Sequence, residues 1–160
     1  MTTASNATMI DTPSECEIVI RRHVGAPREL VFAAYTQAEH VPNWMLGPDG
    51  WSMPICEIDL RPGGAWRFVW RKNDGEELAM SGEYLEVVPP ERVVSSERWG
   101  AEWPETINTV VFREENGGTL ITISVMYPSK QARDAALQSG MVEGMQATFA
   151  KLNSYLEPAA

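Results

Sequence analysis

The most constraining feature of the chain is a series of six strand-like runs followed by one long amphipathic segment. Apolar and polar residues alternate within the runs, and turn-forming pairs such as Asp74-Gly75 and Asn116-Gly117 lie between them. These pairs favour the positive-φ turns that join antiparallel strands. The runs occupy residues 51–60, 65–72, 77–88, 92–99, 106–115 and 119–127. Their regular spacing predicts an antiparallel meander.

The flanking segments complete the predicted architecture. Residues 15–23 alternate like a further strand, and two short helical segments follow, one after Pro27 and one at about residues 38–44. Ser129 is placed to cap a short helix to about residue 139. A last helix from about Met141 to Leu156 would be about 24 Å long. Its apolar stripe comprises Met141, Met145, Phe149, Leu152 and Leu156.

This order predicts an α+β fold, in which helices lie on one side of a single curved antiparallel sheet. We expect about seven strands wrapped on the long C-terminal helix, with two short helices after the first strand. Residues 1–14 are small and polar and are predicted to be a flexible tail, so residues 15–157 are expected to form one domain. A sheet of this shape leaves room for a cavity beneath the helix.

Composition excludes several classes of protein. The chain has 160 residues, and 13 basic against 22 acidic side chains give a net charge of −9. Because nucleic acids and anionic membranes attract basic clusters, which this sequence lacks, neither is an expected partner. No apolar stretch approaches the roughly 18 residues of a membrane span. The first 14 residues have no basic residue and no apolar run, so we expect no secretory signal and a cytoplasmic protein.

Several segments together resemble a known superfamily. Residues 22–27, residues 31–35 and Trp44 resemble the beginning of START-like (SRPBCC, Bet v 1-like) helix-grip proteins. The bacterial branch that is similar to the activator of the heat-shock protein 90 ATPase is indicated by residues 60–67, 74–75, 82–93 and 139–145. The resemblance extends from about residue 15 to residue 156. It implies a helix-grip fold with a hydrophobic cavity between the sheet and the terminal helix.

The resemblance implies the fold more strongly than the function. Its relatives include carriers, cyclases, hydrolases and a co-chaperone module, and a shared fold does not choose among them.

Aromatic and methionine side chains are the candidate ligand contacts. Trp66, Phe68 and Trp70 alternate on one strand face, where they would form either the wall of a cavity or ordinary core packing. Methionine fills irregular apolar spaces and tolerates varied partners. The residues predicted to touch a ligand are Trp44, Trp66, Phe68, Trp70, Met80, Trp99, Met141, Met145 and Phe149.

Two residues are candidates for acid–base chemistry. Glu97 shares a strand face with Trp99, so it would be a desolvated carboxyl with a raised pKa if Trp99 lines the cavity. His40 lies near Trp44 at the expected rim. Cys16 and Cys56 are far apart, and no metal-ligand pattern, phosphate loop or dinucleotide motif occurs. We therefore predict no metal and no cofactor.

These observations lead to one main hypothesis and two alternatives. The main hypothesis is binding of a small, mostly hydrophobic molecule in a cavity between the sheet and the C-terminal helix. The first alternative is an enzyme that uses Glu97 or His40 in the same cavity. The second is an interaction module that regulates a chaperone ATPase through its surface. A free strand edge would also allow a homodimer.

Overall fold

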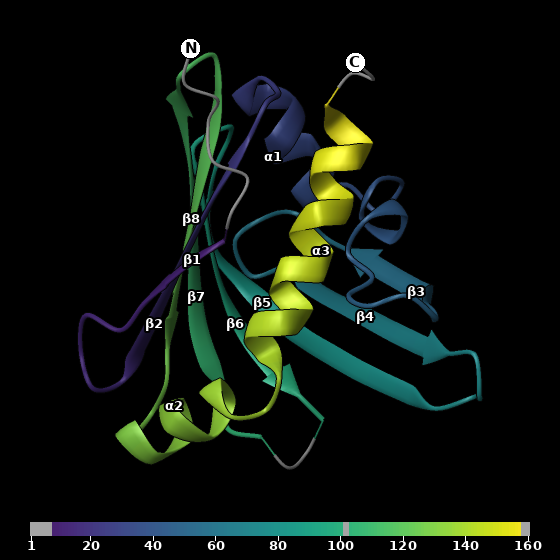
Figure 1. The fold of residues 1–160 in the computed structure, drawn as a ribbon, viewed down its shortest axis with the longest axis vertical. Coiled ribbons are helices and arrows are strands. Elements are labelled where there is room, and N and C mark those ends of the chain that lie inside the picture. The colour runs from purple at the N-terminus through teal and green to yellow at the C-terminus, as the bar shows by residue number, and fades with distance from the viewer. Residues whose placement is uncertain (1–7, 101–102, 158–160) are drawn as a thin grey trace.

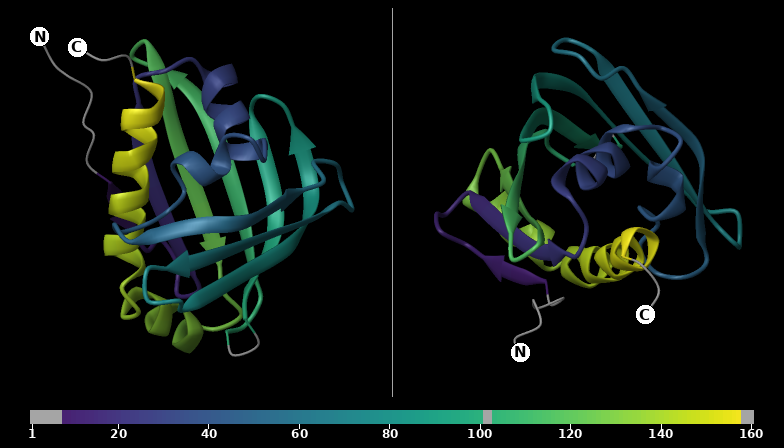
Figure 2. Two further views of the ribbon diagram at one scale, coloured as in Figure 1. Left: turned by 90° about the vertical axis from the view of Figure 1, so that its right-hand side faces the viewer. Right: turned by 90° about the horizontal axis from the view of Figure 1, so that it is seen from above.

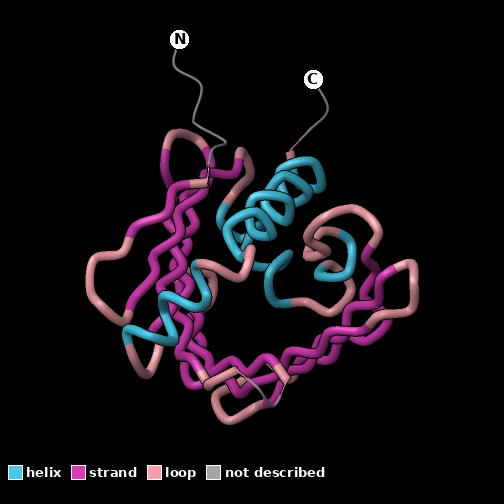
Figure 3. Tube along the Cα trace, turned by 60° about the horizontal axis from the view of Figure 1, so that its bottom comes forward, coloured by secondary structure: helices cyan, strands magenta, loops and turns pink. Residues whose placement is uncertain are grey.

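One curved antiparallel sheet forms the body of the protein. The computed structural model describes residues 8–100 and 103–157. Within them the strand order is β1-β2-β8-β7-β6-β5-β4-β3. Figure 3 shows the strands as a deep trough with the helices in its opening. The strands are β1 (Met9–Asp11), β2 (Glu17–Val24), β3 (Trp51–Ile58), β4 (Ala65–Lys72), β5 (Glu77–Val88), β6 (Arg92–Trp99), β7 (Thr106–Glu115) and β8 (Gly118–Met126).

The helices lie on the inner side of this sheet. Helix α1 (Arg28–Thr36) and the single 3₁₀ turn η1 (Val41–Asn43) follow β2, while α2 (Lys130–Leu137) and α3 (Met141–Leu156) follow β8. Both views of Figure 2 show α3 running along the open side of the trough. Across the described ranges, every helix is too short or too polar to cross a bilayer.

The predicted α+β class and curved sheet are confirmed, with two corrections. Strands β4 to β7 and helix α3 begin and end where the sequence predicts. Over residues 8–100 and 103–157 the sheet has eight strands rather than seven, because β1 pairs with β2 through Ile10 and Ile20. A loose tail was therefore the wrong prediction for residues 9–11, while residues 1–7 lie outside the described part. The helix predicted at residues 38–44 is reduced to η1.

Strand register identifies the side chains that face the helices. Met80 lies opposite Trp99, Ser95 opposite Asn108, and Asn108 opposite Val125. Because directly opposed residues point to the same side of a sheet, these side chains share the inner face. The largest fully buried side chains there include Phe112 and Ile121. The core therefore lies between the inner face and the helices.

The C-terminal half of α3 is fastened to β2 by a buried polar contact. Arg22 faces inward and donates from Nε and Nη2 to Oδ1 of Asn153, at 2.9 and 2.7 Å. Nδ2 of Asn153 donates in turn to Glu157 at 2.7 Å. Burial lowers the pKa of Arg22, and the nearby Glu157 carboxylate opposes that shift. Phe149 and Leu152 pack beside this contact with none of their surface exposed.

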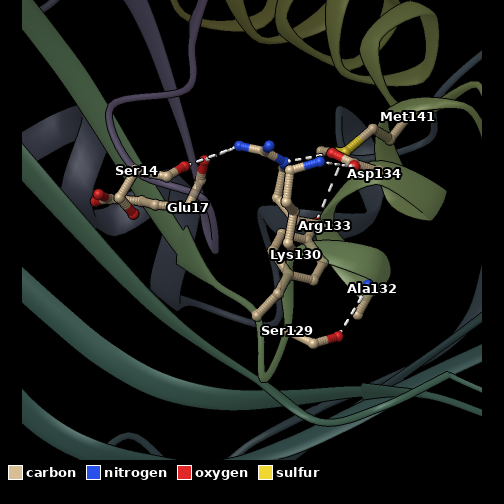
Figure 4. A network of polar contacts seen from close by, with 9 residues as sticks. Ser14, Glu17, Ser129, Lys130, Ala132, Arg133, Asp134 and Met141 are labelled. Carbon is tan, nitrogen blue, oxygen red and sulfur yellow. Dashed lines mark hydrogen bonds and ion pairs between the residues drawn. The ribbon is translucent and has the colours of Figure 1, made fainter.

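Helix α2 determines where α3 begins. The hydroxyl of Ser129 accepts from the Ala132 amide at 3.0 Å, which confirms the predicted N-cap. Arg133 donates to the Ser14 carbonyl at 2.8 Å and to Asp134 at 2.8 Å (Figure 4). These contacts hold α2 against the chain just before β2, so the first turn of α3 starts at a defined position.

Replacing Asn153 by Ala should destabilise the fold by about 2 kcal/mol, because Arg22 would keep a buried charge without its main acceptor. Chemical denaturation in urea measures the difference. The neighbouring Ser154→Ala change removes an exposed side chain and should alter the free energy of unfolding by less than about 0.5 kcal/mol. Equal stabilities of the two variants would contradict this account of the helix anchor.

Candidate functional site

A continuous aromatic wall covers the inner face of β4 and the end of β6. The ring centroids of Trp66 and Phe68 lie 5.0 Å apart, and those of Phe68 and Trp70 lie 5.9 Å apart. Trp70 stacks on Trp99 at 5.3 Å with an interplanar angle of 10°. Met80 lies between them in register, opposite both Phe68 and Trp99. The structure thus brings together five of the predicted ligand contacts.

The nine predicted contacts differ in how accessible they are. Trp44 and Phe149 expose 0% of their surface, so they belong to the packed core. Trp66, Phe68, Trp70 and Met80 are also buried. In contrast, three side chains are only half-buried although they face the interior: Trp99, Met141 and Met145. The partly exposed members of the predicted set are therefore Trp99 at the end of β6 and the two methionines in the first two turns of α3.

Glu97 is half-buried beside Trp99 on the inner face of the sheet. Strand β6 pairs with β5 on one side and β7 on the other. The register with β7 places Glu97 opposite Thr106, with its carboxyl on the inner face. Nε1 of Trp99 donates to Oε1 of Glu97 at 2.8 Å. Burial raises the pKa of Glu97 to about 7, although the bond from Trp99 favours the ionised form and opposes the shift. Glu97 is therefore a carboxyl that changes charge near neutral pH.

Two tyrosines that the sequence reasoning did not select lie near enough to Glu97 for its charge to affect their pKa values. Burial raises the pKa of Tyr127 to about 12, and the charge of Glu97 adds to that shift. The same two causes raise the pKa of Tyr35 in α1. The Tyr127 hydroxyl lies 3.8 Å from the sulfur of Met141, as a weak donor to it. Tyr127 continues the inward alternation of Ile123 and Val125, and that pattern would have identified it.

The absence of a side chain at Gly82 lets β6 and the Trp66 ring pack closely at this point of the sheet. The register between β5 and β6 places Gly82 opposite Glu97, and Trp66 pairs with Gly82 from β4. A Cβ atom at Gly82 would collide with the Ser96 carbonyl oxygen and approach Cε2 of Trp66 to 2.8 Å. Only a residue without a side chain therefore allows this approach of β6 and the Trp66 ring.

His40, the other predicted acid–base residue, lies elsewhere. Its Nδ1 is 2.7 Å from the hydroxyl of Tyr155 in the last turn of α3. Tyr155 is 14 residues beyond Met141, or about 21 Å along the helix. The structure therefore does not bring His40 to the accessible surface around Glu97.

The outer face of the sheet has a depression that does not contain Glu97. A shallow depression of about 480 Å³ lies on the outer face of the sheet, where its lining includes Glu57, Arg67 and Glu83. It does not include Glu97 or Trp99. No group of three or more His, Cys, Asp or Glu side chains in the described ranges is arranged to hold a metal ion.

The sequence matches a known family, and the fold is similar to solved structures of bacterial proteins. The family description "Activator of Hsp90 ATPase homolog 1-like protein" matches residues 25–157. A crystal structure of a protein from Rhodobacter sphaeroides is 30% identical, with a TM-score of 0.88, and the match covers 92% of this chain and 96% of that one. No curated protein matches the sequence significantly.

Two further solved structures are similar. A protein from Chromobacterium violaceum is 28% identical, with a TM-score of 0.76 and coverage of 89% of this chain and 99% of that one. The AHSA1-like protein from Aeromonas hydrophila is 20% identical, with a TM-score of 0.71 and coverage of 87% and 93%. The second of these supports the fold alone.

Glu97 should make the protein less stable as the pH rises. Its pKa is about 7 in the folded state and near 4.5 in an ordinary glutamate, so the folded state holds the extra proton between these values. Stability from this group is therefore present below about pH 4.5 and is lost as the pH approaches 7.

Glu97→Gln removes this dependence. The free energy of unfolding of this variant, relative to that of the wild type, should rise by about 1–3 kcal/mol between pH 5 and pH 8. Urea denaturation across this range measures the difference, and the exposed Glu83→Gln is the matched control. A stability difference for Glu97→Gln that does not change with pH would contradict the burial of this carboxyl.

Gly82→Ala should cost more than about 2 kcal/mol, since β6 and the Trp66 ring must both move to admit the methyl group. Gly144 in α3 is the control, because a Cβ there meets nothing within 4 Å. Gly144→Ala should stabilise the helix by about 0.5–1 kcal/mol. Thermal or urea unfolding measures both changes in stability. The packing argument would be refuted if both substitutions stabilised the protein or both destabilised it.

Proposed function

The chain belongs to the family of Activator of Hsp90 ATPase homolog 1-like proteins, and we propose that it binds a small, mostly apolar molecule between its sheet and the first two turns of α3. The observation that carries this proposal is the contrast along α3. Phe149 and Leu152 are fully buried, whereas Met141 and Met145 on the same stripe are only half-buried. Apolar surface that faces the interior and remains accessible is surface that a ligand would cover.

The chemistry of this surface suits a ligand with an aromatic or other flat apolar body. Trp99 presents a large ring, and its stacking on Trp70 holds that ring in place. Met141 and Met145 lie in the first two turns of α3, and their flexible thioethers adapt to varied shapes. Each Å² of apolar surface removed from water contributes about 25 cal/mol, so covering these side chains favours binding.

The polar groups at this surface are few and close together. Among the described residues, Glu97 accepts one hydrogen bond from Trp99, and the Tyr127 hydroxyl has only the weak contact with the Met141 sulfur. A small number of convergent polar groups in an apolar surround fixes a ligand's orientation. The proposed ligand therefore places one polar group toward Glu97 and its apolar body toward the aromatic wall.

Acid–base catalysis on the bound molecule is a second candidate. The observation that favours it is the pKa of Glu97, which at about 7 lies where a general acid or base is most effective. This candidate predicts that Glu97→Gln abolishes turnover of a bound molecule while leaving its affinity nearly unchanged. Regulation of a chaperone, which the family description suggests, would instead require stimulation of a purified chaperone's ATPase.

Isothermal titration with naphthalen-1-ylmethanol tests the binding proposal. Met145→Trp should weaken binding by at least about tenfold, because the larger ring fills the space beneath the first turns of α3. Met126→Trp is the matched control, since Met126 is exposed on β8 and points away from the helices. No binding by the wild type, or equal loss in both variants, would contradict the proposed site.

A further inference from the structure

The carboxylate of Glu97 can accept more hydrogen bonds than the protein supplies to it. Trp99 supplies one hydrogen bond to Oε1. Among the described residues, no lysine, arginine or histidine pairs with this carboxyl. A carboxylate in an apolar surround is costly unless a positive charge or further donors compensate it. At the surface where a ligand would bind, the described residues therefore supply Glu97 with one hydrogen bond and no positive charge.

The two buried arginines among the described residues already have hydrogen-bond partners elsewhere. Arg22, on the inner face of β2, donates to Asn153 and to Thr8. Arg133 is held by the Ser14 carbonyl and Asp134. These two side chains would have to break buried hydrogen bonds to reach Glu97. The missing positive charge is therefore not supplied by a simple rearrangement of either side chain.

The groups around Glu97 also favour a cation. The ring of Trp99 adjoins the carboxyl, and Tyr35 and Tyr127 lie close enough to respond to its charge. The faces of aromatic rings carry partial negative charge and attract cations, most strongly where water is excluded. The net charge of −9 adds a long-range attraction for positive molecules.

We propose that the molecule bound at this site carries a basic nitrogen, for which Glu97 is the counter-charge and the Trp99 and tyrosine rings form the surround. This inference rests on the proposed binding function and specifies its ligand class as an apolar amine. The ammonium group would donate to the carboxylate of Glu97, while the apolar body covers Trp99, Met141 and Met145. A ligand carboxylate would be repelled at the same position.

The affinity for an amine should also depend on pH. The titratable groups that act on Glu97 are Tyr35 from α1 and Tyr127 after β8, and both stay neutral below pH 9. On the two neighbouring strands the residues opposite Glu97 are Gly82 and Thr106, which carry no charge. Affinity for an amine should therefore rise between pH 6 and pH 8 as Glu97 ionises, and affinity for an alcohol should not.

Three probes with one aromatic body test the inference: naphthalen-1-ylmethylamine, naphthalen-1-ylmethanol and 1-naphthoic acid. At pH 8 the amine should bind at least about tenfold more tightly than the alcohol, and the acid should bind most weakly. Glu97→Gln should remove the preference for the amine and leave the alcohol's affinity within about twofold. The control Glu83→Gln, on the outer side of the sheet, should preserve the preference.

The outcomes separate the two proposals. Equal affinities of the amine and the alcohol, with both lost in Met145→Trp, would overturn the amine inference and leave the binding site standing. An amine preference that survives Glu97→Gln would also overturn the inference. If none of the three probes binds, the proposed function fails and the amine inference fails with it.

Discussion

The anchoring of one half of α3 is the constraint on which the rest of the structure depends. Asn153 accepts two hydrogen bonds from the buried guanidinium of Arg22, and Phe149 and Leu152 close the core beside it. Buried polar groups require such partners, so the helix has little freedom at this end. In the described part of the chain, the only side-chain hydrogen bond of the first two turns of α3 is the weak one from Tyr127, just after β8, to Met141. One end of the helix is therefore held by buried polar contacts, and we propose that a ligand binds at the other end, where Met141 and Met145 are half-buried.

The properties of Glu97 follow from its place in the sheet. Strand β6 has paired neighbours on both sides, so its inward side chains are shielded from the outer surface. Gly82 opposite Glu97 lets the strands and the Trp66 ring approach closely. The remaining neighbours are aromatic or uncharged, which makes burial the largest influence on the pKa of Glu97. A single carboxyl in this position can serve as a counter-charge, a hydrogen-bond donor or a proton carrier, according to what binds beside it.

Local sequence patterns predicted most of the fold. The alternation in β4 to β7 and the apolar stripe of α3 each extend over at least eight residues, and both were predicted within their observed bounds. Strand β1 has three residues and only Ile10 faces neighbouring side chains, so it offered no alternation to detect. Parity alone placed Glu97 beside Trp99 on one face, and the structure confirms that arrangement.

Contacts between distant segments were beyond sequence reasoning. The pairing of Arg22 with Asn153 spans 131 positions, and no local pattern reports it. The same is true of the approach of Tyr35 and Tyr127 to Glu97. Alternation also could not separate Trp44, which is fully buried, from Trp99, which is accessible, because burial depends on what the helices cover.

The most direct test of the account is to locate a bound probe by nuclear magnetic resonance. The methionine methyl groups can be labelled with ¹³C, and they report on both surfaces: Met141 and Met145 lie in the first two turns of α3 and pack against the core, whereas Met9 and Met126 are exposed. With naphthalen-1-ylmethanol bound, we expect intermolecular Overhauser effects to the methyl groups of Met141 and Met145 and none to those of Met9 and Met126. Effects confined to Met9 or Met126 would place the molecule on the outer surface and contradict the account.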